Sequence, residues 1–172
     1  MDEFEGFYNK ALKFLSYRPR SEKEVKDKLK VQSEKLKVEN SKVVIDRIIQ
    51  KLKEKKFIND EEFAKGWIES RLRFKPRGLR LIELELKKKG ISSETINNLQ
   101  LTINDLEQAK KLVEKKMTRF RTPPRGLSSA EGEQFGMTRE EIYQKLGRFL
   151  ASKGFSWDTI KQAIDETLRK GV

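Results

Sequence analysis

Apolar residues recur at steps of three and four positions along most of the chain, a spacing that is typical of amphipathic α-helices. The 172 residues include only 10 Gly and 4 Pro, and Leu, Ile, Lys and Glu dominate, so the bulk propensity is helical. We therefore predict an all-α fold. Nine helices are expected, with apolar stripes that contain Leu12, Leu29, Ile48, Ile68, Ile82, Ile96, Val113, Leu146 and Ile160.

Polar residues mark the positions where several of these helices begin. Ser21 with Glu24, and Thr138 with Glu141, have the spacing of a capping box, in which the side chain of each residue bonds the backbone N–H of the other. Further N-caps are predicted at Asn59, Ser92 and Ser156.

A repeated pattern divides the chain into three parts. Residues 56–63, 89–96 and 153–160 align without gaps, and each gives Lys, a break, an apolar residue, an N-cap and an acid in the first turn. An aromatic residue followed by a Pro-Arg bend precedes each of them, as in 74–78. We predict three tandem three-helix repeats over residues 1–58, 59–101 and 102–172. Such small units must stack on one another, which favours an elongated helical array.

The stretch 122–137 interrupts the third repeat. It contains two prolines, three glycines and two serines, a composition that is typical of a loop. We expect a mobile loop here.

Composition excludes several classes of function. The chain has no Cys and no His, which removes disulfides, thiolate nucleophiles, Ser-His-Asp relays and zinc sites built from imidazole or thiolate. It has no Walker A motif and no apolar run of the length that spans a bilayer, and its acidic start does not resemble a signal peptide. A cytoplasmic protein without a cofactor is the expectation.

Positive charge is concentrated in the middle of the chain. Eight Lys or Arg and two acids fall between Arg71 and Gly90, so this stretch carries half of the net charge of +12. The charge surrounds the Pro76-Arg77-Gly78 bend, where proline holds an arginine at low entropy cost. An anionic partner is indicated, either nucleic acid or an acidic protein surface. A membrane surface ranks last, because no helix has a bulky aromatic face with a basic rim.

Three other motifs have simpler structural interpretations. The basic run at 87–89 ends a helix, where cations offset the helix dipole. Trp67 and Trp157 could stack on bases, but both lie in or beside apolar stripes, so a core position is favoured. The acids at 60–62 could hold Mg²⁺ in a nuclease, but all three fall in the first turn of a helix, where acids serve as caps.

The segments 57–64, 76–78, 85–91 and 145–155 resemble the RecX family of bacterial regulators of the RecA recombinase. The resemblance implies a curved, all-helical array of three tandem three-helix repeats. It also implies a non-catalytic protein that lies in the groove of the RecA filament on single-stranded DNA and suppresses ATP hydrolysis, strand exchange and coprotease activity. Members of the family bind DNA by themselves as well, so single-stranded and also double-stranded DNA are expected as partners. Nothing suggests an obligate dimer, so a monomer is expected.

The candidate contact residues follow from the bends and the charge. They are Arg71, Arg73, Lys75, Arg77, Arg80 and Lys88 in the central repeat, with Arg18, Arg20, Arg125 and Arg148 as equivalents in the outer repeats. Two alternatives remain open. One is a DNA-binding module that acts without recombinase, and the other is a divalent-metal nuclease that uses Asp60, Glu61 and Glu62.

Overall fold

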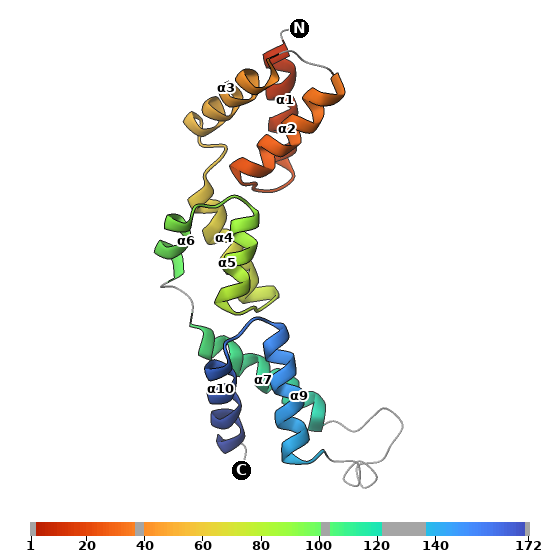
Figure 1. Cartoon of the computed structure of the whole chain (residues 1–172), viewed down its shortest axis with the longest axis vertical. Helices are drawn as coiled ribbons and strands as arrows, with labels where there is room; N and C mark the ends of the chain where they lie inside the picture. Colours follow the sequence, from red (N-terminus) through yellow and green to blue (C-terminus); the bar gives the residue numbers. More distant parts are fainter. Residues whose placement is uncertain (1–2, 37–39, 101–103, 122–136, 171–172) are drawn as a thin grey trace. The chain divides into compact units, whose positions relative to one another are not determined.

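The computed structural model describes residues 3–36, 40–100, 104–121 and 137–170, and over these residues the chain forms nine α-helices and no strand. The helices are α1 (Glu3–Ser16), α2 (Glu22–Leu36), α3 (Ser41–Glu54), α4 (Asp60–Phe74), α5 (Leu79–Lys88), α6 (Ser93–Gln100), α7 (Asp105–Arg121), α9 (Arg139–Ser152) and α10 (Trp157–Lys170) (Figure 1). The all-α prediction is confirmed. The loop expected at 122–137 lies outside the described residues, except for Met137.

The chain packs as two compact units. The first contains Met1–Glu69 and Leu84–Leu99, and the second contains Ser70–Glu83 and Gln100–Val172. The division falls inside α4 and α5 and before the last residue of α6, so each of these helices contributes residues to both units. The repeat boundaries near residues 59 and 102, and the elongation and curvature of the array, stay predictions.

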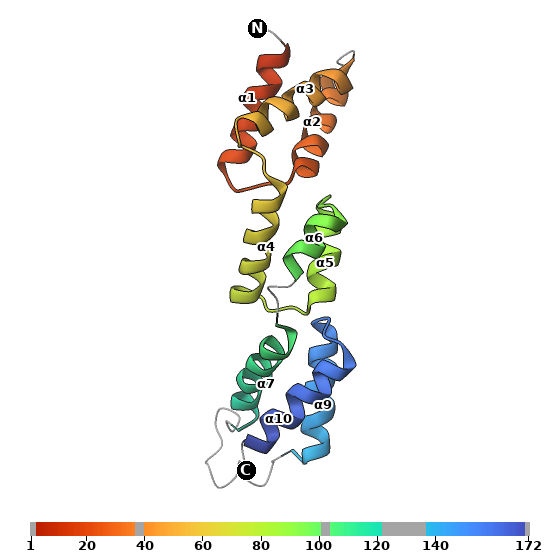
Figure 2. The same ribbon diagram turned by 90° about the vertical axis from the view of Figure 1, so that its left-hand side faces the viewer.

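In the first unit, α1, α2 and α3 pack against one another around an apolar core (Figure 1). Val25 and Leu29 from α2 meet Ile48 and Leu52 from α3, and all four side chains are completely buried. Four such side chains contribute about 6 to 12 kcal/mol of burial free energy. The second unit repeats this arrangement with α7, α9 and α10 (Figure 2). Its core is formed by Ala109, Val113, Leu146, Leu150, Phe155, Ile160, Ala163 and Ile164.

Three helices end in the same way. A residue with a left-handed backbone follows each helix, namely Lys56 (φ 57°), Gly90 (φ 83°) and Gly154 (φ 85°). The next residue donates its N–H five positions back, the bond that defines a Schellman stop. These bonds join Phe57 to Leu52 (2.9 Å), Ile91 to Leu86 (3.1 Å) and Phe155 to Leu150 (3.4 Å).

The predicted alignment of these segments without gaps is wrong for the first copy. Ser92 and Ser156 cap the following helices two residues after Gly90 and Gly154. In the first copy the left-handed residue is Lys56 rather than Phe57, so three positions separate it from the cap Asn59. The first copy therefore has one extra residue between the helix stop and the next helix.

The predicted caps are confirmed. The reciprocal bonds of a capping box are present between Ser21 and Glu24 and between Thr138 and Glu141. Asn59 Oδ1 accepts from the backbone N–H groups of Glu61 (3.0 Å) and Glu62 (3.2 Å).

One prediction of a buried side chain is wrong. Trp157 is 65% exposed, because it is the first residue of α10 and lies before the turn that carries Ile160 into the core. Trp67 is partly buried in the first unit, where its indole N–H donates to Glu85 (2.8 Å).

Candidate functional site

The first Pro-Arg bend, between α1 and α2, uses Arg18 in an ion pair inside the chain. The Arg18 guanidinium donates to both carboxylate oxygens of Glu24, at 2.8 and 3.2 Å. Lys89 reaches the same carboxylate at 2.5 Å. Burial alone would raise the pKa of Glu24, but the hydrogen bonds from Arg18 and Lys89 outweigh it and lower the pKa to about 2. Glu24 is therefore ionised at neutral pH and ties together three segments of the first unit.

Arg20, the other arginine of this bend, packs on its own unit. Its guanidinium lies 3.7 Å from the ring centroid of Phe14, and its Nε donates to the Phe14 carbonyl oxygen (3.2 Å). Both arginines of the first bend thus have structural roles. Tyr17, the aromatic residue of this bend, is 72% exposed.

The start of α2 packs against the end of α5 in the first unit. The hydroxyl of Ser21 is buried and donates to the Lys89 carbonyl oxygen at 2.6 Å, and the Lys23 ammonium donates to the Lys88 carbonyl oxygen at 3.2 Å. Asp60 accepts from the backbone N–H of Glu22 at 2.8 Å and so caps α2. The Lys88–Lys89 backbone is therefore part of a packing junction, which supports the structural interpretation of the basic run.

The second unit contains an equivalent junction around the second Pro-Arg bend. The Gly78 N–H donates to the Lys153 carbonyl oxygen (2.9 Å), and Asp105 accepts from the Leu79 N–H at 2.9 and 3.2 Å, which caps α5. A Cβ atom on Gly78 would lie 2.5 Å from the Gly154 carbonyl oxygen. Glycine is required here by close backbone packing. Burial raises the pKa of Asp105, against the lowering effect of its hydrogen bond from Leu79.

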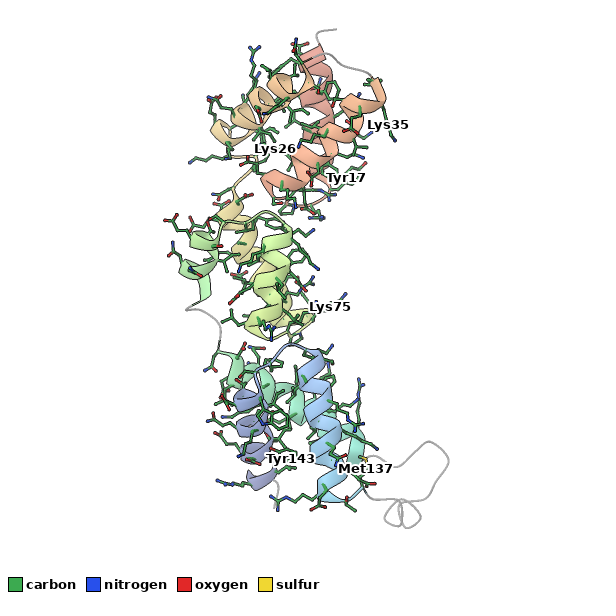
Figure 3. The ribbon with its side chains drawn as sticks, in the orientation of Figure 1. Tyr17, Lys26, Lys35, Lys75, Met137 and Tyr143 are labelled. Carbon is green, nitrogen blue, oxygen red and sulfur yellow. The ribbon has the colours of Figure 1, made fainter. Side chains whose placement is uncertain are left out.

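The second bend opens onto a groove in the second unit with a volume of about 330 Å³. The loop between α4 and α5 forms one wall, and α7 and the end of α9 form the other. We call it the basic groove, because its lining contains six cationic side chains and no acid. The six are Lys75, Arg77, Lys115, Lys116, Arg119 and Lys153. Lys75 points away from the ribbon in Figure 3.

Two aromatic rings complete the groove. Phe74, at the end of α4, is 69% exposed. The ring of Phe149 in α9 is partly buried, and the ammonium groups of Lys116 and Lys153 lie 5.3 and 5.6 Å from its centroid. These are cation-π contacts, which hold both lysines at the groove wall.

The structure places only two of the predicted contact residues, Lys75 and Arg77, in the basic groove. Arg71, Arg73, Arg80 and Arg148 do not line it, although the Arg73 guanidinium lies 5.2 Å from the ring centroid of Phe74. Arg125 is outside the described residues. The sequence reasoning missed Lys115, Lys116, Arg119 and Lys153 as groove residues. The i, i+4 spacing of Lys115 and Arg119 on one predicted helix was the available signal.

Other classes of site have little support. No group of three or more carboxylates in the described part of the chain could hold a metal ion. Of the acids proposed for a metal site, Asp60 caps α2 and Glu61 pairs with Lys65 at 2.6 Å. None of the helices in the described ranges is long and apolar enough to cross a membrane.

Comparison with protein families gives three matches in chain order. The model described as "RecX, first three-helix domain" matches residues 8–32, the second three-helix domain matches 59–98 and the third matches 136–164. Together they span more than half of the chain.

Curated relatives are similar over nearly the whole chain. "Regulatory protein RecX" of Bacillus subtilis (strain 168) is 33% identical over 165 residues, which cover 96% of this chain and 56% of the relative. The protein of the same name from Clostridium tetani is 35% identical over 162 residues, which cover 92% of this chain and 65% of the relative. This chain therefore spans a little more than half to about two thirds of the length of these curated relatives.

A crystal structure of RecX from Lactobacillus salivarius superposes with a TM-score of 0.73 at 29% identity, and covers 95% of this chain and 96% of that one. A second structure, of a regulatory protein RecX, gives a TM-score of 0.72 at 24% identity. The superposition covers 95% of this chain and 74% of that one. The fold is therefore that of known helical repeat structures.

Proposed function

Because the chain belongs to the RecX family, we propose that it is a non-catalytic regulator of the RecA recombinase. It binds in the groove of the RecA filament on single-stranded DNA and suppresses ATP hydrolysis, strand exchange and coprotease activity. The observation that carries this proposal is the match of all three RecX three-helix domains in their order along the chain. The protein acts as a monomer in the cytoplasm and needs no cofactor.

A repeat architecture suits this role. Repeats that each offer one contact surface let a single molecule touch several filament subunits, and linked contacts raise the overall affinity without any single strong site. A molecule held at several subunits would oppose the subunit rearrangements that accompany hydrolysis. Inhibition then needs no catalytic group on this chain.

A second candidate is a DNA-binding module that acts without recombinase. The basic groove favours it, because six cations around one short bend suit a phosphate backbone. The two candidates differ in what holds the protein. A RecA filament offers both protein surfaces and DNA phosphates for contact, whereas naked DNA offers no protein surface.

Sedimentation at increasing salt separates the two. Labelled chain is mixed with preformed RecA filaments on long single-stranded DNA, and in parallel with the same DNA alone at the same nucleotide concentration. We expect the chain to pellet with filaments at salt concentrations that already release it from naked DNA, since counterion release weakens the phosphate contacts selectively. Equal release from both at every salt concentration would favour the DNA-binding module.

A further inference from the structure

We propose that the basic groove binds the phosphates of a nucleotide chain while a base stacks on the exposed ring of Phe74. All of its lining residues belong to the second unit, so the site is complete within that unit. The inference rests on the proposed function only in taking nucleic acid as a ligand of this chain. It assigns that ligand to a particular surface and gives each group a role.

The cations are placed on opposite walls of the groove. Lys115 and Arg119 lie one turn apart on α7, about 6 Å along the helix axis. Lys75 comes from the α4–α5 loop on the other wall. These three side chains form no salt bridge with the described residues. A phosphate chain that enters the groove therefore meets cations on both sides without displacing an internal carboxylate.

Lys116 and Lys153 differ from these three because they already contact the ring of Phe149. The ring restrains two long side chains, so less conformational entropy is lost when a phosphate binds them. Phe149 thus positions cations, and its face is occupied. Phe74 also has a cation beside its ring, since the Arg73 guanidinium lies 5.2 Å from its centroid, but 69% of the Phe74 surface is exposed.

An exposed ring beside six cations favours an unpaired nucleotide over other anions. Bases stack on aromatic side chains with little regard to sequence, while cations follow the backbone. In a duplex the base faces are covered by neighbouring bases, so a duplex has no face to offer Phe74. An acidic peptide would satisfy the cations but not the ring. The volume of about 330 Å³ suits a short segment of strand.

The first test measures affinity for a labelled oligothymidylate by fluorescence anisotropy, with the full chain and no recombinase. The groove variant is K115Q/R119Q. The matched control is K161Q/R169Q, which also removes one Lys and one Arg, from exposed positions of α10 outside the groove. The groove variant should lose about tenfold in affinity. Its slope of log K against log salt should fall by about 1.4, because about 0.7 is lost for each single-strand phosphate contact.

The second variant pair tests stacking. Phe74→Leu removes the ring from the groove, and Trp157→Leu removes an equally exposed ring at the start of α10. F74L should weaken oligothymidylate binding about fivefold or more and leave the salt slope unchanged, whereas W157L should match the wild-type protein. Both rings are exposed, so neither change should alter the helical circular dichroism signal.

Competition with a free nucleoside triphosphate identifies the source of the phosphates. If excess triphosphate leaves the oligonucleotide bound, the ligand is a strand. If it displaces the oligonucleotide, and K115Q/R119Q weakens both, the groove takes free nucleotides as well. Both results support the inference. It is overturned if K115Q/R119Q and F74L bind the oligonucleotide no more weakly than their controls.

An assay of ATP hydrolysis by RecA on single-stranded DNA, with the wild-type chain and the groove variants added, separates this inference from the proposed function. If the groove variants bind the oligonucleotide as their controls do but no longer inhibit RecA, the groove contacts protein, so the inference fails and the proposed function stands. If they lose oligonucleotide binding while the wild-type chain has no effect on RecA, the groove assignment stands and the proposed function fails.

Discussion

Gly78 packs directly against the backbone of the turn between α9 and α10. Its N–H bonds the Lys153 carbonyl oxygen, and the space where a Cβ would lie is already filled by the backbone of Gly154 and Phe155, at 2.5 to 2.8 Å. Backbone atoms cannot rotate away as a side chain can. Gly78 is therefore fixed by the packing of the bend against the turn between α9 and α10, and not only by the angle of the bend.

Gly78→Ala should lower the free energy of unfolding by about 1 to 3 kcal/mol, the usual cost of overpacking a close contact. Chemical denaturation followed by circular dichroism measures this. Gly66→Ala is the control, because a Cβ on Gly66 would meet nothing within 4 Å and alanine favours the interior of α4. A G78A protein as stable as the wild type would contradict the account of the junction.

Elements in the two units meet through the same kind of junction. In each, the start of one helix packs against a Schellman stop and is capped by an aspartate from another helix. Asp60 caps α2 and Asp105 caps α5, while the stops are at Gly90 and Gly154. Ser21 and Gly78 occupy equivalent places, since one donates its hydroxyl to the Lys89 carbonyl and the other its N–H to the Lys153 carbonyl.

The junction of the first unit should weaken in acid. The folded pKa of Glu24 is about 2, below its unfolded value, so its contribution is complete above the unfolded pKa and is lost as pH falls toward 2. Because the Glu24 side chain is 17% exposed, we expect a contribution of about 1 to 3 kcal/mol at neutral pH.

Glu24→Gln tests this contribution. The variant should be less stable than the wild type at pH 7, and the difference should shrink between about pH 5 and pH 2. Glu34→Gln, an exposed position on the same helix, is the control. Thermal melts at several pH values would measure the effect, and a difference that is constant with pH would argue against the Arg18–Glu24–Lys89 cluster.

Sequence reasoning succeeded where the signal is local. The capping box of Ser21 with Glu24 spans three residues, and the stop at Gly90 needs only its own helix, so both could be read from spacing. The bond of Asp105 to Leu79 joins residues 26 positions apart, and no local pattern encodes it. The i, i+4 spacing of Lys115 and Arg119 is visible in the sequence, but only packing brings α7 opposite the Pro76 bend, so their place in the groove is not.

The two Pro-Arg bends show what a sequence repeat does not predict. From the repeat we expected Arg18 and Arg20 to have the same role as Lys75 and Arg77. In the structure Arg18 is paired with Glu24 and Arg20 stacks on Phe14, whereas Lys75 and Arg77 line the basic groove. Equivalent positions in a repeat can have the same backbone location while their side chains have different neighbours.

At the scale of the whole molecule, the proposed function depends on several weak contacts acting together. In this proposal the basic groove would supply one contact, and other surfaces of the repeats would supply the rest. Loss of one contact should therefore reduce inhibition of the filament without abolishing it, since linked contacts share the binding free energy.

The most direct test is single-stranded-DNA-dependent ATP hydrolysis by RecA while this protein is titrated, with DNA in large excess. Excess DNA prevents a basic protein from acting merely by covering the strand. The account predicts that hydrolysis falls at protein concentrations well below that of RecA. Hydrolysis that is unchanged until the DNA itself is saturated would contradict regulation of the filament and leave a DNA-binding module.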